Sequence, residues 1–255
     1  MCRVLTFPSP FVSFDSINRN GTRLAKVLSL EDFQRDVKGN TLPQYAHISP
    51  NLDNDGHDTG LQFGTSWIRT FLTPLLANEQ FMDRTLILLT YDESERYNLP
   101  NHIVSVLLGG SVPQEMRGTK EDTFYTHYSI LSTLENNWDL PNLGRYDVGA
   151  NVFKLVADQT GYANHPPSNR ALINCSLSYA GFMNNLLGMS AAIPPPNLKL
   201  IGAGGKGVHA SVDAAWSIMS NELTPYDGSG NVYDGGDGVT NKNAPVYKAQ
   251  APASS

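Results

Sequence analysis

The chain has 255 residues, of which 40% are hydrophobic and 16% are charged. This composition is enough for a substantial core and argues against a disordered chain or a coiled coil. The formal net charge of −6 argues against nucleic-acid binding through a basic surface. No apolar run reaches the roughly 18 residues that a membrane span needs, and the two cysteines are too few for a thiolate metal site.

The first predicted elements are a helix and a strand. Ser29 and Asp32 have capping-box spacing, and the apolar stripe that follows predicts a helix over 29–38 that stops at Gly39. The short apolar run at 44–48 ends in Ser-Pro and predicts a strand.

A second helix is predicted after a loop at 51–60 that is dense in Asp, Asn and Gly. Trp67, Phe71 and Leu75 recur at i, i+4 and i+8, which is the spacing of one helix face. Pro74 lies within this stripe and favours a kink there.

The middle of the chain predicts two more strands and two more helices. The continuously apolar segment 84–91 predicts a strand buried on both faces of a sheet, and 103–108 predicts another. Helices are predicted at 128–138, with Leu131 on its apolar face, and at 152–157. This order of elements indicates an α/β domain with a largely parallel central sheet.

The composition shifts near Pro194, after which Gly and Pro become frequent. The Gly-rich segment 202–207 lacks the spacing of a phosphate-binding loop and predicts a flexible loop. The end of the chain is predicted to be mostly irregular, and 221–255 to be dispensable for stability. We therefore divide the chain into 1–160 and an extension at 161–255 that is largely irregular towards the C-terminus.

Two acidic clusters each follow a predicted strand. Asp55, His57 and Asp58 follow the first strand, and Asp92 and Glu93 follow the second. A right-handed crossover would bring both clusters to one sheet edge, where ligands bind in open α/β sheets. Carboxylates and an imidazole there can hold a divalent cation or serve as general acid and base. Taken alone, the Asp-Asn-Asp-Gly segment is also an ordinary turn sequence.

Other candidates carry weaker signals. His127 precedes a predicted helix, where it could contact an anion or serve only in capping and packing. The segment 227–231 begins like a calcium loop but lacks the later Gly and Glu of that motif. No Ser lies in a nucleophile-elbow context, so a lipase-like triad is not supported.

An ordered series of short motifs resembles a known family, the phosphoesterase family of fungal secreted acid phosphatases, which is related to bacterial phospholipases C. The resemblance runs from about residue 14 to residue 161. Its motifs are Thr-Leu-Pro-Gln-Tyr at 41–45, Ile-Ser-Pro-Asn at 48–51, Asp-Gly-His-Asp-Thr at 55–59, Trp-Ile-Arg-Thr-Phe-Leu at 67–72, Leu-Thr-Tyr-Asp-Glu at 89–93, His-Tyr-Ser at 127–129, Glu-Asn-Asn-Trp at 135–138 and the run at 143–153.

The resemblance implies an alkaline-phosphatase-like, three-layer α/β/α fold, of which 1–160 would be the C-terminal part. It also implies metal-assisted hydrolysis of small phosphomonoesters. Asp92 and Glu93 match an acidic pair expected to bind a divalent metal ion of unknown identity. Asp55, His57 and Asp58 match a motif expected to face the phosphate or the metal, and His127 matches a recurrent catalytic His.

Two family features are not found in the sequence: an early Glu-Asn metal pair and a Pro-Ser-Glu-Pro-Asn-type segment that supplies the nucleophile. The chain is therefore expected to lack the N-terminal half of the domain and to be impaired as an enzyme. Two alternatives stay open. One is a phospholipase C-type phosphodiesterase, and the other is a non-catalytic remnant that binds metal or phosphate.

The expected location of the full-length protein is outside the cell or in the cell wall. The resemblance and two glycosylation sequons, at Asn20 and Asn174, favour secretion and a glycoprotein. The first residues of this chain do not form a signal peptide, because prolines follow at once.

Overall fold

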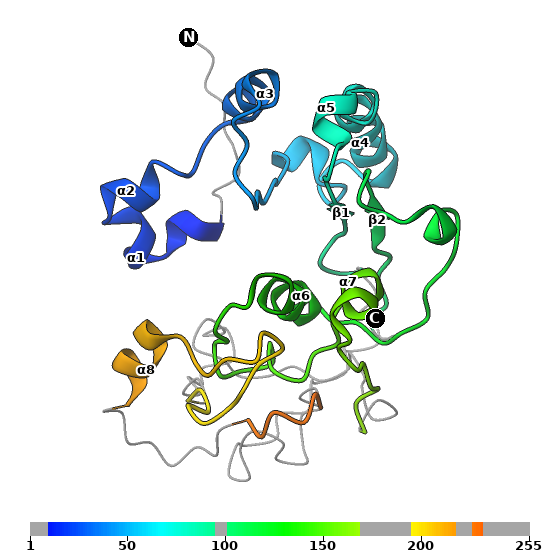
Figure 1. The fold of residues 1–255 in the computed structure, drawn as a ribbon. Coiled ribbons are helices and arrows are strands. Elements are labelled where there is room, and N and C mark those ends of the chain that lie inside the picture. Colours follow the sequence, from blue (N-terminus) through cyan, green and yellow to red (C-terminus); the bar gives the residue numbers. More distant parts are fainter. Residues whose placement is uncertain (1–9, 95–100, 169–194, 218–225, 232–255) are drawn as a thin grey trace, which may run out of the picture. The chain divides into compact units, whose positions relative to one another are not determined.

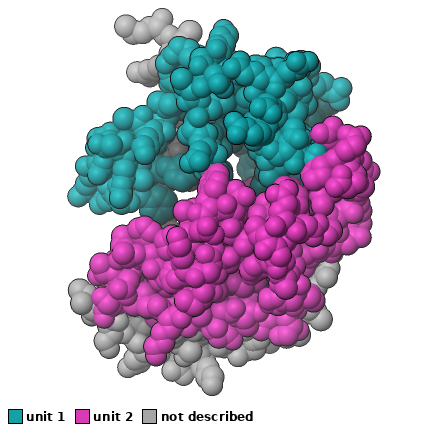
Figure 2. Space-filling view, viewed as in Figure 1, with its two compact units in different colours: residues 1–88, 107–112 teal, residues 89–106, 113–255 magenta. Residues whose placement is uncertain are grey.

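The computed structural model describes residues 10–94, 101–168, 195–217 and 226–231. The chain divides into two compact units, which Figure 2 colours separately and which we describe one at a time. Unit 1 comprises residues 1–88 and 107–112, and unit 2 comprises residues 89–106 and 113–255.

Helices dominate the described part of unit 1 (Figure 1). The helix predicted at 29–38 is confirmed as α3, and its capping box is present, since Ser29 Oγ accepts from Asp32 N at 3.2 Å and Asp32 Oδ2 accepts from Ser29 N at 3.0 Å. Gly39 is its last residue, and Asn40, in the left-handed conformation, is its C-cap. The elements are η1 (Pro10–Ser13), α1 (Asp15–Asn18), α2 (Gly21–Leu24), α3 (Leu30–Gly39), η2 (Leu52–Asn54), α4 (Leu61–Leu76) and α5 (Glu79–Met82).

The predicted apolar stripe of α4 packs against its neighbours in unit 1. Trp67 and Phe71 stack with ring centroids 5.0 Å apart, and Phe33 of α3 lies 5.8 Å from Phe71. Phe33 also meets Phe81 of α5 edge to face at 6.4 Å. Pro74 stays inside the helix, close to its C-terminal end, where few hydrogen bonds remain to be lost.

The strand predicted at 44–48 is not formed, and that prediction is wrong for this structure. Tyr45 and Ile48 are 46% and 37% exposed. A strand is stabilised by pairing with a neighbour, and within the described residues the two strands of the sheet pair with each other and not with this segment.

The sheet contains two short strands, β1 (Ile87–Leu89) and β2 (Val106–Leu108). Both were predicted longer, and β1 is half-buried rather than buried on both faces. Ser111 N donates to Thr85 O at 3.2 Å, whereas Thr90 Oγ1 lies 2.8 Å from Ser105 Oγ. Residue numbers therefore rise along one strand and fall along the other, so the two strands are antiparallel. The described fold is a mixture of helices and strands, consistent with α/β, but the parallel sheet is not confirmed.

Unit 2 is organised around the helix predicted at 128–138. Its described elements are η3 (Gln114–Met116), α6 (Tyr128–Trp138), α7 (Lys154–Thr160) and α8 (Ala210–Trp216). The buried face of α6 carries hydroxyl groups: Ser132 Oγ donates to Ala150 O at 2.8 Å, and Thr133 Oγ1 accepts from Phe153 N at 2.9 Å. Leu131, on the face predicted to be buried, is 38% exposed. These hydroxyls provide hydrogen-bond partners for the backbone of the loop at 150–153.

The Gly-rich segment 202–207 is not a loose loop, which corrects the sequence-based prediction. Asn142 Nδ2 donates to the carbonyls of Leu200 at 3.2 Å and Lys206 at 2.9 Å. A Cβ added at Gly204 would lie 2.5 Å from the carbonyl oxygens of Glu135 and Leu140. Here glycine allows the close approach of two backbone segments rather than flexibility.

Part of the C-terminal region also packs into unit 2. Tyr226 is 3% exposed, and its hydroxyl donates to Val148 O at 3.1 Å and accepts from Gly230 N at 2.5 Å. A Cβ on Gly149 would lie 2.5 Å from Gly230 N. This packing argues against the prediction that 221–255 is dispensable, as far as 226–231 is concerned, and the rest of that segment lies outside the described residues. The boundary at residue 160 stays a prediction.

Two deletions should separate these parts of the C-terminal region. Removing 226–255 should lower the free energy of unfolding by about 3 kcal/mol or more, because truncating a buried aromatic side chain costs about 3–5 kcal/mol. Removing only 232–255, which is rich in small and polar residues, should change it by less than about 1 kcal/mol. Chemical unfolding of the three proteins measures this, and equal stabilities would show that Tyr226 does not contribute.

Candidate functional site

The first candidate group lies in the loop between η2 and α4. Asp55 Oδ1 accepts from His57 N at 2.8 Å, which closes a tight turn around Gly56, whose φ is +88°. His57 Nδ1 lies 2.7 Å from Asp58 Oδ1. This pairing orients the imidazole ring, as in catalytic His–carboxylate pairs. Both side chains are exposed, at 68% and 50%, so a ligand can reach them.

The loop is held against α4 by a close approach of two glycines. A Cβ on Gly64 of α4 would lie 3.1 Å from both Cα and N of Gly56. Thr59 Oγ1 donates to Asp53 O at 2.7 Å across the same loop. The position of the Asp55–Asp58 group therefore depends on small residues at 56 and 64.

An open groove of about 460 Å³ adjoins this loop along α4. Its walls combine hydroxyl and amide groups with two aromatic rings. The lining residues are Asn54, Thr59, Gln62, Phe63, Ser66, Trp67 and Thr70.

The second candidate group follows β1 in unit 2. Asp92 Oδ1 accepts from Glu93 N at 3.0 Å, and both residues are exposed. Asn101 holds this loop through both ends of its amide: Nδ2 donates to Asp92 O at 2.8 Å, and Oδ1 accepts from Ser94 N at 2.8 Å. Sequence reasoning missed Asn101, because an isolated Asn carries no motif that would single it out.

His127 joins the same loop. Its Nε2 lies 3.0 Å from Asp92 O, so a protonated Nε2 donates to that carbonyl. His127 is the residue directly before α6, which therefore connects the Asp92 loop to the core of unit 2. The structure thus places the His127 side chain against the backbone of Asp92.

The six predicted site residues fall into two groups. Asp55, His57 and Asp58 belong to unit 1, and Asp92, Glu93 and His127 belong to unit 2. The convergence of the two groups at one sheet edge stays a prediction.

The donor atoms fit a divalent cation in kind, since carboxylate oxygens and imidazole nitrogens are its usual ligands. The number of such side chains gathered in one place is smaller than a complete cation site needs. The described residues contain no group of three or more His, Cys, Asp or Glu side chains placed to hold a metal ion. Asp92 and Glu93 would supply two carboxylates of a larger coordination sphere.

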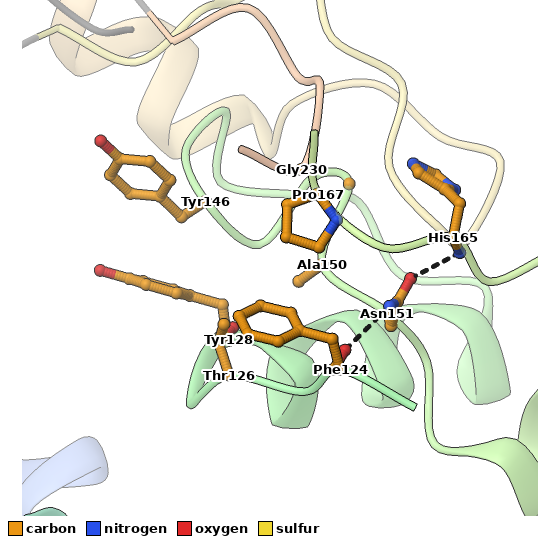
Figure 3. Close-up of a pocket in the computed structure, with 10 residues that line it drawn as sticks. Phe124, Thr126, Tyr128, Tyr146, Ala150, Asn151, His165, Pro167 and Gly230 are labelled. Atoms are coloured by element: carbon orange, nitrogen blue, oxygen red, sulfur yellow. Dashed lines mark hydrogen bonds between the residues drawn. The ribbon is translucent and has the colours of Figure 1, made fainter. Parts of the chain in front are cut away.

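Unit 2 also contains a small cavity of about 10 Å³, shown in Figure 3. Tyr128 and Tyr146 line it, with ring centroids 5.3 Å apart, and the hydroxyl of Thr126 is buried there without a hydrogen-bond partner. Asn151 fixes one wall by donating to Phe124 O at 2.8 Å and accepting from His165 N at 2.9 Å. This volume holds about one water molecule, so the cavity cannot admit a phosphate ester.

The chain belongs to the Phosphoesterase family, whose model matches residues 9–141. It is 46% identical over 208 residues to a probable acid phosphatase of Kluyveromyces lactis, and this match covers 82% of this chain and 48% of the relative. It is 50% identical over 157 residues to an acid phosphatase of Aspergillus fumigatus, covering 62% and 35% of the two chains. With a phosphate-repressible acid phosphatase of Penicillium chrysogenum it shares 47% identity over 156 residues, covering 61% and 38%.

The chain spans about half or less of the length of these curated relatives. No solved structure matches it. In the described part of the chain, no helix has the length and apolar character needed to cross a membrane.

Proposed function

We propose that this protein is an acid phosphatase-type hydrolase that cleaves small phosphomonoesters with the help of a divalent metal ion. One observation carries the proposal: all six candidate residues lie within residues 9–141, the part of the chain that matches the Phosphoesterase family. The similarity to three fungal acid phosphatases supports a monoester rather than a diester as substrate.

In the proposed reaction, a hydroxyl nucleophile attacks phosphorus in line with the leaving group. His57, oriented by Asp58 at 2.7 Å, protonates the leaving alkoxide. Asp92 and Glu93 would hold the divalent metal, and the chemistry it would supply is charge neutralisation at the phosphoryl oxygens. His127 and Asn101 hold the Asp92 carbonyl, and Asp55 shapes the turn that presents His57.

The proposal includes the alkaline-phosphatase-like, three-layer α/β/α arrangement with a largely parallel central sheet. The groove beside Thr59 and Trp67 would receive the organic part of the ester. The formal net charge of −6 argues for a small substrate over a polyanion.

The decisive experiment compares two proteins: this chain, and a chimera in which the matching residues of this chain replace the corresponding part of the Kluyveromyces relative. We expect the chimera to hydrolyse 4-nitrophenyl phosphate at acidic pH, and this chain to do so at least about 100-fold more slowly. The reason is that the early metal pair and the nucleophile segment of the family are not found in this sequence, and catalytic groups that act as a unit lose most of their effect when some of them are missing. Full activity of this chain would contradict the expected impairment.

A chimera that folds but is inactive would favour the non-catalytic alternative. A chimera that prefers bis(4-nitrophenyl) phosphate to the monoester would favour the phosphodiesterase alternative. The two substrates therefore distinguish the three functions that the sequence leaves open.

Secretion and glycosylation remain proposals. Asn20 is exposed at the N-cap of α2, where its Oδ1 accepts from Arg23 N at 3.1 Å, and Asn174 lies outside the described residues. A glycan at Asn20 would appear as a loss of mass when protein from a secreting host is enzymatically deglycosylated.

A further inference from the structure

Two carboxylic acids are buried side by side in unit 2, away from the candidate site residues. Glu135 of α6 is 4% exposed, and Asp147, in the loop after α6, is 1% exposed. Asp147 lies near enough to Glu135 to raise the pKa of the Glu135 carboxyl, after burial, which is the larger cause. Two ionised carboxylates at such close range can only repel each other, so the buried pair is stable when one of the two holds a proton.

The surrounding donors decide which of the two carries that proton. Asp147 accepts from two backbone amides, Leu143 N at 2.5 Å and Arg145 N at 3.0 Å. Glu135 Oε2 is buried without a hydrogen-bond partner, and a Cβ added at Gly202 would lie 2.9 Å from it. An ionised Glu135 would leave this oxygen charged and unsolvated, so the proton belongs to Glu135 and the acceptor role to Asp147.

The other titratable groups around the pair do not offset this. The guanidinium of Arg145 lies over the ring of Trp216, 5.2 Å from its centroid, and interacts with Asp147. Tyr162, near Glu135, and Tyr128 and Tyr226, near Asp147, are neutral phenols whose pKa burial raises. Lys199 and Lys206, of the packed loop, are exposed. Burial and the Asp147 carboxylate together raise the pKa of Glu135 to about 9.

We propose that Glu135 and Asp147 form a proton-dependent latch that holds α6 to the segments at 142–147 and 200–207, and that the latch is closed at acidic pH and weakens as the pH rises. Three segments meet at this point. Asn142, fully buried, bonds the carbonyls of Leu200 and Lys206, and Asn136 Nδ2 donates to Ala203 O at 2.9 Å.

Helix α6 connects the latch to the candidate site. α6 carries Glu135 and begins directly after His127, whose Nε2 lies 3.0 Å from Asp92 O. Ionising Glu135 would place two negative charges in contact inside the unit and push α6 away from the loop at 142–147. The contact between His127 and Asp92 would then be weakened above neutral pH. This consequence rests on the proposed function, whereas the latch itself does not.

The sign of the pH dependence follows from the raised pKa. The folded protein binds a proton on Glu135 that the unfolded chain releases above its ordinary pKa of 4.5. The stabilisation is complete below that value and is lost as the pH rises towards about 9. Between pH 5 and pH 7 the unfolding equilibrium constant should therefore rise by up to about tenfold per pH unit from this one group.

The test is chemical unfolding of the full chain at pH 5, 6 and 7, with three variants. Glu135→Gln keeps a donor for Asp147 but cannot ionise, so it should remove this part of the pH dependence. Asp147→Asn should weaken it without removing it, because the repelling charge is gone while Glu135 stays buried. Glu115→Gln, an exposed residue of the same unit, is the matched control and should follow the parent chain. The same pH dependence in the parent chain and in Glu135→Gln would overturn the proposal.

A second measurement does not depend on the stability of the variants. At neutral pH the parent chain should show the infrared carbonyl band of one protonated carboxylic acid, which disappears on unfolding. Absence of this band in the folded chain at pH 7 would show that Glu135 is ionised and would overturn the proposal. Neither measurement uses enzyme activity, so a failed latch and a failed phosphatase assignment remain distinguishable.

Discussion

Replacing Asp92 by alanine in the active chimera should lower kcat/KM for 4-nitrophenyl phosphate by at least about 100-fold. Removing one preorganised charge-stabilising group costs about 10²–10³ in rate, and the proposal gives Asp92 the task of holding the metal that stabilises phosphoryl charge. The side chain is exposed, and within the described residues its one hydrogen bond is from the local amide of Glu93 at 3.0 Å, so its loss should cost little stability.

The control for this variant is Asp83→Ala. Asp83 is an exposed acid at the other end of the β1 segment, beside Arg84, and should leave activity within about twofold of the parent because exposed ion pairs contribute little. Activity of both variants is then measured over a series of divalent metal concentrations. Partial recovery of Asp92→Ala at high metal would support a ligand role. Unimpaired activity of Asp92→Ala would contradict the metal assignment while leaving the family unchanged.

The helices were predictable because their signals are local. The capping box of Ser29 and Asp32 lies within four consecutive residues, and the spacing of Trp67, Phe71 and Leu75 is set by one helix alone. The range of α6 was predicted correctly for the same reason, although its buried face was not. That face carries Ser132 and other hydroxyls because they form hydrogen bonds with the backbone of the loop at 150–153, a contact that the sequence of the helix does not reveal.

The failed predictions all depend on contacts between residues far apart in the chain. The segment 44–48 has the composition of a strand, but pairing decides whether it becomes one. The glycines at 202–207 were interpreted as flexible because nothing in their sequence indicates that Asn142 and Glu135 lie against them. The packing of Tyr226 was missed for the same reason, since its hydrogen-bond partner Val148 is 78 residues away in the sequence.

The candidate site contains both local features that the sequence predicts and a long-range contact that it does not. Asp55, His57 and Asp58 could be found from one short motif, and the pairing of His57 with Asp58 at 2.7 Å is a contact between neighbours. By contrast, the bond between His127 and Asp92 O spans 35 residues. Its residues could be nominated from the sequence, but their contact could not.

Replacing His57 by alanine in the chimera should lower kcat/KM by about 10²–10⁴, the usual contribution of a general acid. The size of the loss should depend on the leaving group. 4-Nitrophenolate leaves readily without a proton, whereas an alkoxide needs one, so the loss should be larger for an alkyl phosphate than for 4-nitrophenyl phosphate. This dependence follows from proton donation and not from a structural role, because a misplaced loop would slow both substrates alike.

Two variants give this experiment its controls. His47→Ala removes another exposed imidazole of unit 1, which lies 3.3 Å from Ser49 Oγ, and should lower neither rate by more than about twofold. Asp58→Asn keeps a hydrogen-bond acceptor but removes the charge 2.7 Å from His57 Nδ1, so it should reproduce the leaving-group dependence in weaker form. An equal loss on both substrates in His57→Ala would contradict proton donation. The imidazole would then be assigned to binding the phosphate, and Asp58→Asn would be expected to raise KM rather than to lower kcat.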